Sequence, residues 1–105
     1  MIDLHPIEIL LERITSKWHL AQIWLFGSRA RGDARPSSDW DLFVVLPDEA
    51  PDGDFDPQVG WQLQRASGVS ADVIACRATD FREDRATPNT LAFDVGREGL
   101  LVRER

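Results

Sequence analysis

Two short apolar runs, one on each side of a glycine-serine turn and a proline break, constrain the fold of this chain more than any other feature. Residues 22–26 and 41–46 are continuous apolar stretches rich in branched and aromatic side chains, which is typical of buried strands. Gly27 and Ser28 end the first run, and Pro36 interrupts the chain before the second. The sequence therefore predicts two core strands that lie close together along the chain.

The rest of the sequence alternates helical and strand patterns, which predicts a mixed α/β fold class. Apolar residues recur at helical spacing near the N-terminus, and about one helical turn follows Gly27 and Ser28. The highly charged stretch at residues 47–57 has no periodicity and is predicted to be a solvated loop. The further predictions are helices at 5–18, 59–66 and from 87 to about 97, a helical turn at 80–84, and strands at 70–77 and 100–102.

Length and composition exclude several function classes. A chain of 105 residues is long enough for one core, so residues 1–105 are predicted to form a single domain. The net charge of -6 argues against direct nucleic-acid binding, because a phosphate backbone favours a basic face. With no apolar stretch of membrane-spanning length and no signal-like start, we expect no membrane association and a cytoplasmic protein. The single cysteine, Cys76, excludes an intrachain disulfide and is expected to be a small buried hydrophobe in a strand.

Asp39 and Asp41 form the pair most suggestive of chemistry. Residues i and i+2 of a strand project to the same face, about 6.5 to 7 Å apart, so these carboxylates can converge while Trp40 points away. Two Mg²⁺ ions about 3.5 to 4 Å apart can share such a pair. Asp72, a charged residue in an apolar strand, is the candidate third carboxylate, and an exposed strand-end acid is the alternative interpretation.

The turn at Gly27 and Ser28 is a candidate phosphate-binding turn. Gly27 allows close backbone approach, Ser28 offers a hydroxyl, and the following helical N-terminus directs N–H groups at an anion. Arginines 29, 31 and 35 add positive charge nearby, and Arg29 is predicted to bind the nucleotide together with the turn.

Other ligand motifs fail on spacing. There is no Walker ending, and the glycines at 27 and 32 lack dinucleotide-turn spacing. The acids at 52, 54 and 56 resemble the opening of a calcium loop, but Pro57 and Leu63 occupy the positions that need glycine and glutamate. The two histidines, at 5 and 19, have no co-ligands beside them and are predicted to lie at the surface or at helix ends.

Three segments together resemble the polymerase-beta-type nucleotidyltransferase superfamily, and most closely its minimal, stand-alone MNT branch. They are Phe-Gly-Ser-Arg-Ala-Arg-Gly at 26–32, Ser-Asp-Trp-Asp-Leu at 38–42 and Ala-Asp-Val at 71–73. The resemblance covers almost the whole chain and implies a small mixed β-sheet flanked by helices. It implies that Gly27 and Ser28 hold the triphosphate of ATP, that Asp39 and Asp41 bind two Mg²⁺ ions, and that Asp72 serves the nucleophile's metal. Trp40 departs from the pattern, which usually has an aliphatic residue there.

The resemblance also implies a partner. MNT proteins are typically paired with a HEPN-domain RNase toxin and act as antitoxins by transferring AMP from ATP to a toxin tyrosine. This chain has no tyrosine, so such an acceptor must lie on another molecule. Two alternatives remain: a binding module that neutralises its partner by occlusion, and transfer to a small molecule such as an aminoglycoside. Homo- and hetero-oligomers both fit the sequence.

Overall fold

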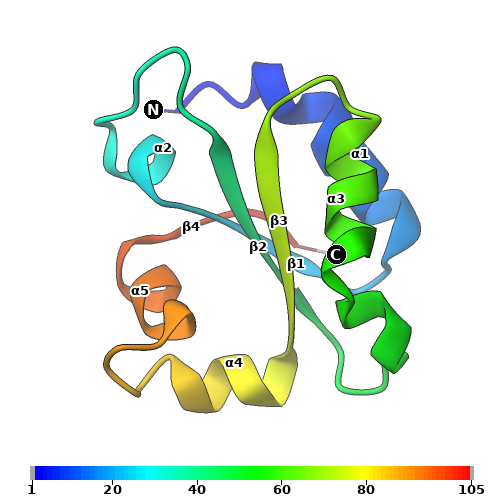
Figure 1. Ribbon diagram of the computed structural model, residues 1–105. Helices are drawn as coiled ribbons and strands as arrows, with labels where there is room; N and C mark the ends of the chain where they lie inside the picture. The colour runs from blue at the N-terminus through cyan, green and yellow to red at the C-terminus, as the bar shows by residue number, and fades with distance from the viewer. Residues whose placement is uncertain (1, 105) are drawn as a thin grey trace.

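The computed structural model describes residues 2–104 and shows a four-stranded sheet with helices on both faces (Figure 1). None of the helices in this part of the chain is long and apolar enough to cross a membrane. In chain order the elements are η1 (His5–Ile7), α1 (Glu8–Lys17), β1 (Gln22–Phe26), α2 (Ser28–Arg31), β2 (Trp40–Leu46), η2 (Asp52–Phe55), α3 (Pro57–Arg65), β3 (Ala71–Arg77), α4 (Ala78–Asp84), α5 (Leu91–Glu98) and β4 (Leu100–Glu104).

The sheet is mixed, as the predicted fold class requires. Its strand order is β3-β2-β1-β4, with β1 antiparallel to both β2 and β4 and β2 parallel to β3. In such an arrangement the last residue of β1 and the first residues of β2 and β3 lie side by side at the same end of the sheet. The topology therefore brings three distant parts of the sequence to the same place.

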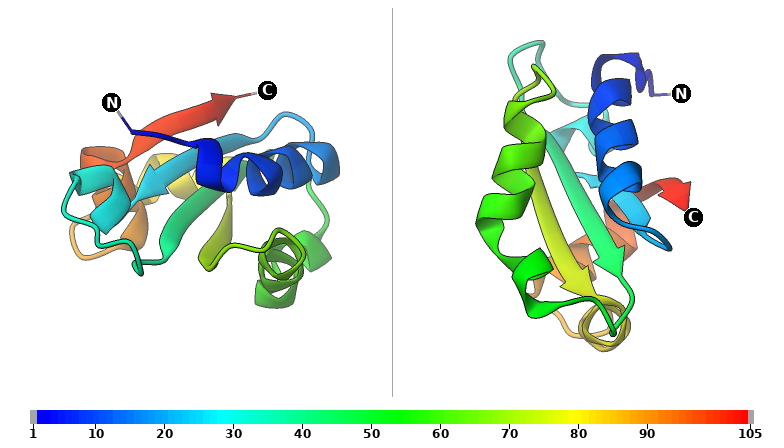
Figure 2. Two further views of the ribbon diagram at one scale, coloured as in Figure 1. Left: turned by 90° about the horizontal axis from the view of Figure 1, so that it is seen from above. Right: turned by 90° about the vertical axis from the view of Figure 1, so that its right-hand side faces the viewer.

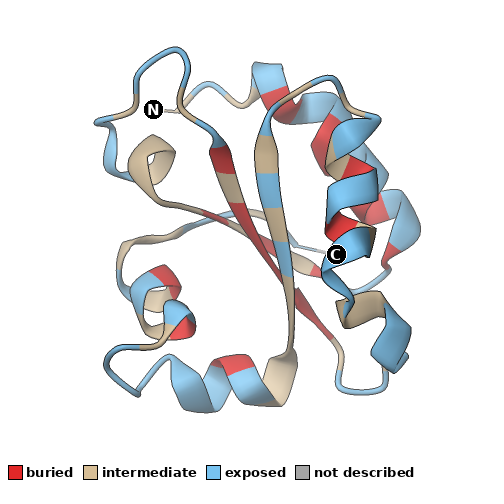
Figure 3. Ribbon diagram, viewed as in Figure 1, coloured by how far each residue is buried: buried red, intermediate tan, exposed pale blue. Residues whose placement is uncertain are grey.

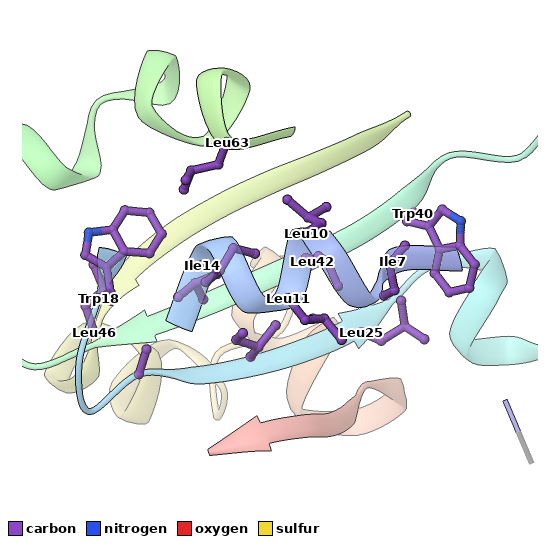
Figure 4. Close-up of a cluster of buried hydrophobic side chains, with 13 residues drawn as sticks. Ile7, Leu10, Leu11, Ile14, Trp18, Leu25, Trp40, Leu42, Leu46 and Leu63 are labelled. Carbon is purple, nitrogen blue, oxygen red and sulfur yellow. The ribbon is translucent and has the colours of Figure 1, made fainter. Parts of the chain in front are cut away.

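Alternation along β2 divides the core into two layers. Leu42 and Val44 pack with α1 and α3 on one face, whereas Phe43 and Val45 pack with α4 and α5 on the other (Figures 1 and 2). β2 is buried along most of its length, whereas β3 alternates between half-buried and exposed residues from Ala71 to Ala75 and is half-buried from there to Arg77 (Figure 3). The cluster under α1 is the larger of the two and is drawn in Figure 4.

The predicted helices and strands are present, but several of their bounds differ, as three cases show. The stretch at 47–57 is not all loop, because η2 forms inside it and the Arg77 guanidinium donates to the carbonyl oxygens of Asp48 and Ala50. The last helix begins at Leu91 rather than near residue 87, because the Thr90 hydroxyl accepts the Phe93 N–H and caps the helix there. α4 extends from residue 78 instead of covering only 80–84.

Gly60 sets the distance between α3 and β3. A Cβ atom at this position would lie 2.2 Å from the carbonyl oxygen of Val73, which is far inside van der Waals contact. The backbone of β3 cannot move aside without disturbing its pairing with β2. The close packing of helix on strand therefore depends on the missing side chain.

Replacing Gly60 with alanine should destabilise the protein. We expect Gly60→Ala to lower the free energy of unfolding by about 1–3 kcal/mol, because α3 must move off the sheet. Gly53→Ala is the control, because a Cβ there has nothing within 4 Å, and its effect should be within about 0.5 kcal/mol. Urea denaturation measures both, and equal stabilities would contradict the packing argument.

Candidate functional site

The three predicted metal-binding aspartates lie at the end of the sheet where β2 and β3 begin. Asp41 and Asp72 are direct partners in the parallel ladder, so their side chains project to the same face, the one covered by α4 and α5. Asp39 lies just before β2, two residues ahead of Asp41 on the same alternation. Asp39 and Asp72 are exposed, and Asp41 is half-buried.

Asp39 already has a partner. Its Oδ1 atom accepts a hydrogen bond of 2.5 Å from the hydroxyl of Ser70, the residue that precedes β3. Within residues 2–104, no three acidic, histidine or cysteine side chains are close enough together to hold a metal ion as they stand. Coordination by all three aspartates would therefore require their side chains to move closer together.

Gly27 packs directly against the Asp41 carboxylate. A Cβ atom on Gly27 would lie only 2.3 Å from Oδ2 of Asp41, and the glycine has φ +75° and ψ −156°, a conformation that other residues rarely adopt. Phe26, the preceding residue, pairs with Asp41 across the antiparallel ladder. The turn thus follows the last pair of the β1–β2 ladder, with its backbone touching the acid.

The turn also presents the start of α2 to the site. The Gly27 carbonyl accepts the amides of Ala30 and Arg31, so these hydrogen bonds close the first helical turn. The amides at the very start of a helix have no intrahelical acceptor and attract anions. Ser28, the first residue of α2, is half-buried at this position.

A hollow of about 380 Å³ lies beside the turn, between α2 and α5. Its size falls within the range of small-molecule sites, which is about 300–1,000 Å³. It offers apolar surface, two arginines and two acids. The lining residues are Phe26, Gly27, Arg31, Leu91, Asp94, Arg97 and Glu98.

Negative charge is concentrated at Asp41. Burial raises the pKa of its carboxyl above the ordinary value, and repulsion from Asp72 and Asp39 raises the pKa further. Arg31 opposes this rise and is also 3.7 Å from the Glu98 carboxylate. A cation placed among these carboxylates would relieve the repulsion.

Arg29 points to the loop before β2. Its guanidinium donates to the carbonyl oxygens of Ser38 (2.8 Å) and Pro36 (3.2 Å) and lies 4.5 Å from the centre of the Trp40 ring. These contacts were not expected from the sequence, which suggested nucleotide binding for Arg29. That role remains a prediction.

The other candidate groups lie outside this cluster. Asp52 forms an ion pair with Arg77, and the Asp56 carboxylate accepts the Gln58 amide at the start of α3, so two of the three acids of the calcium-like loop have structural partners. Cys76 is only half-buried, and desolvation together with nearby aspartates raises the pKa of its thiol to about 11. Both histidines are exposed, as predicted.

Replacing Gly27 with alanine should disrupt nucleotide binding. We expect Gly27→Ala to weaken Mg·ATP affinity by at least about tenfold, because the new methyl group displaces the Asp41 carboxylate. Gly32→Ala is the control, because Gly32 has φ +84° but a Cβ there would have nothing within 4 Å. Calorimetry compares the two variants, and equal affinities would contradict a role for the Gly27–Asp41 contact.

Removing the Asp41 charge should stabilise the metal-free protein. A carboxyl whose pKa is raised by folding destabilises the fold when ionised, so Asp41→Asn should unfold at higher urea than wild type at pH 7 in EDTA. The difference should shrink as the pH falls through the raised pKa and should vanish below the ordinary value of 3.8. Adding Mg²⁺ should stabilise wild type only. If Asp41→Asn were less stable than wild type in EDTA, the conclusion that the ionised Asp41 carboxyl destabilises the fold would be wrong.

Comparisons with known proteins identify the family of this chain and support its fold. The family model described as "Nucleotidyltransferase domain" matches residues 7–91, and no curated protein sequence matches the chain. A protein of Sulfolobus solfataricus, provisionally assigned as a nucleotidyltransferase, shares the fold with a TM-score of 0.65 and 24% identity over 97% of this chain and 80% of its own. A toxin-antitoxin complex solved with AMP-PNP has a TM-score of 0.61 and 17% identity over 91% of this chain and 71% of the other. The family match spans most of the sequence, and the chain therefore belongs to the nucleotidyltransferase domain family.

Proposed function

We propose that this protein is a Mg²⁺-dependent antitoxin that transfers AMP from ATP to a tyrosine of a HEPN-domain RNase toxin. The main support is the convergence of the Gly27 turn, Asp41 and Asp72 at one edge of the sheet. A phosphate-binding turn beside carboxylates is what nucleotidyl transfer needs. Membership of the nucleotidyltransferase family supports transferase activity in general.

The Gly27 turn lies between a candidate site for the triphosphate and a candidate site for the nucleoside. The first amides of α2 and the Ser28 hydroxyl are suited to bind the triphosphate, because they combine free donors with the positive end of a short helix. The hollow between α2 and α5 has room for the nucleoside, with Phe26 and Leu91 as apolar surface and Arg31 and Arg97 as cations. The solved neighbour that carries AMP-PNP supports a nucleotide on this fold.

The aspartates fit magnesium by their chemistry. Asp39, Asp41 and Asp72 offer hard oxygen ligands, and the pKa of Asp41 is raised first by burial and then by the neighbouring charges of Asp72 and Asp39, which a cation would offset. Asp39 and Asp41 would hold both ions, and Asp72 would complete the shell on the acceptor side. When bound, Mg²⁺ neutralises the leaving phosphates and makes the acceptor hydroxyl more acidic.

The transfer exchanges one phosphorus–oxygen bond for another. The acceptor oxygen attacks the α-phosphorus of ATP, the bond to the oxygen that bridges the α- and β-phosphates breaks, and pyrophosphate leaves with that electron pair. The acceptor hydroxyl releases its proton to solvent. The chain's own contribution is orientation, because the turn holds the phosphates on one side of Asp41 and Asp72 lies on the other.

The acceptor side of the site is open to a macromolecule. Asp72 lies on β3, an edge strand, and Ile74, two residues along on the same face, is 38% exposed. A protein tyrosine can reach a carboxylate that lies on an exposed edge. The chain itself contains no tyrosine, and the toxin-antitoxin neighbour supports a protein partner.

The decisive test is transfer to a toxin. Catalytic amounts of the protein, with ATP and Mg²⁺, should add AMP to a tyrosine of a co-encoded HEPN protein, detected by mass spectrometry, and abolish its RNase activity. Asp39→Asn with Asp41→Asn should lose this transfer by orders of magnitude, because the swap removes charge with almost no change in shape. Inhibition that needs stoichiometric protein, proceeds without ATP and survives the double substitution would establish occlusion instead.

Asp72→Asn separates binding from chemistry. We expect Mg·ATP binding to survive and turnover to fall by orders of magnitude, because only the acceptor-side ion loses a ligand. Asp54→Asn in η2, beyond the far end of β2, is the control and should leave both unchanged. Unchanged turnover in Asp72→Asn would make Asp72 a strand-end acid without a catalytic role.

A further inference from the structure

Arg29 and Trp40 connect the phosphate turn to the strand that carries the acids. We propose that these two side chains form a clamp that fixes Asp39 and Asp41 relative to the Gly27 turn, so that Arg29 is a positioning residue. The mechanistic part of this inference rests on the proposed nucleotidyl transfer. The clamp itself rests on contacts between residues that lie eleven positions apart in the sequence.

The aromatic half of the clamp is fixed by the core. Trp40 is 6% exposed and belongs to the buried cluster under α1, where it lies at the end of β2 nearest α2 (Figure 4). Because side chains alternate along a strand, its ring lies on the face opposite Asp41. Moving the ring would therefore disturb the core as well as the acid.

The cationic half is fixed by three contacts. One terminal nitrogen of Arg29 donates to the carbonyl oxygens of Ser38 and Pro36, and the guanidinium lies 4.5 Å from the Trp40 ring centre. The Nε atom is buried and has no hydrogen-bond partner within residues 2–104. A partly desolvated cation interacts more strongly with an aromatic face. Lysine would keep the charge but could not reproduce the planar group's contacts.

The start of β2 is therefore held from both faces. On the face covered by α4 and α5, the Gly27 backbone touches the Asp41 carboxylate. On the face covered by α1 and α3, Arg29 contacts both neighbours of Asp39 in the sequence. It donates to the Ser38 carbonyl and lies against the Trp40 ring. Gly27 and Arg29 belong to one turn, so the two contacts fix the distance between phosphate-binding and metal-binding groups. A displacement of about 1 Å at such a site can cost about 100-fold in rate.

The test compares two arginine–tryptophan stacks. Arg29→Lys and Trp40→Leu break the clamp, whereas Trp40→Phe retains an aromatic face. Arg65→Lys and Trp61→Leu are controls for the loss of a cation–π contact outside the site, because Arg65 lies 5.2 Å from the ring of Trp61, which is exposed on α3. Hydrogen exchange of the segment 33–39 in ligand-free protein reports the clamp directly, and kcat and KM for ATP report its effect on transfer.

We expect Arg29→Lys and Trp40→Leu each to speed exchange of segment 33–39 and to lower kcat by at least about tenfold, with KM for ATP changed by less than about threefold. The double variant should lose less than the sum of the two single effects, because both substitutions remove the contact between Arg29 and Trp40. Trp40→Phe should be close to wild type in exchange, and the two controls should match wild type throughout.

Each other outcome is informative. Unchanged exchange in both clamp variants would overturn the proposal. A rise in KM for ATP with Arg29→Lys, with no effect of Trp40→Leu, would also overturn it and would identify Arg29 as a direct nucleotide ligand. If wild type transfers no AMP but the clamp variants still exchange faster than the controls, the clamp stands and the proposed function fails.

Discussion

The contact between the Gly27 backbone and the Asp41 carboxylate is the constraint on which the site depends. Only a residue without a side chain can occupy that position, and its positive φ turns the chain from β1 into α2. The same contact buries part of Asp41 beside two other carboxylates and contributes to the rise in its pKa. Burial and the neighbouring carboxylates together make an ionised Asp41 unfavourable for the isolated protein.

The mixed sheet explains why the site lies where it does. Because β1 is antiparallel to β2 and β2 is parallel to β3, the last residue of β1 lies beside the first residues of β2 and β3 at one end of the sheet. An all-antiparallel order would place Asp72 at the far end of the sheet. α1 and α3 pack on one face of the sheet and α4 and α5 on the other, and the edge strand β3 leaves Asp72 and Ile74 exposed.

Much of the fold could be predicted because local signals agreed with tertiary packing. The strand at Gln22–Phe26 was predicted to the residue, since an apolar run ends there at a glycine. The start of α5 was misjudged because Thr87 and Thr90 are both plausible caps, and only the fold selects the hydroxyl that meets the Phe93 amide. Inside the loop at 47–57, η2 was missed because a 3₁₀ turn has little periodicity and Arg77, which anchors the loop, comes from β3.

The sequence by itself determined the chemical groups: a glycine-serine turn, an aspartate pair two residues apart and a third aspartate in a later strand. These groups can be recognised from local sequence alone. Residue type gives the charge of each side chain, and a spacing of two residues places two side chains on the same face of a strand. The tertiary structure decided the lateral register of Asp41 with Asp72, the hydrogen bond from Ser70 to Asp39, and the stacking of Arg29 on Trp40. These contacts join residues far apart in the chain, and their geometry follows from strand pairing and core packing, which no local pattern encodes.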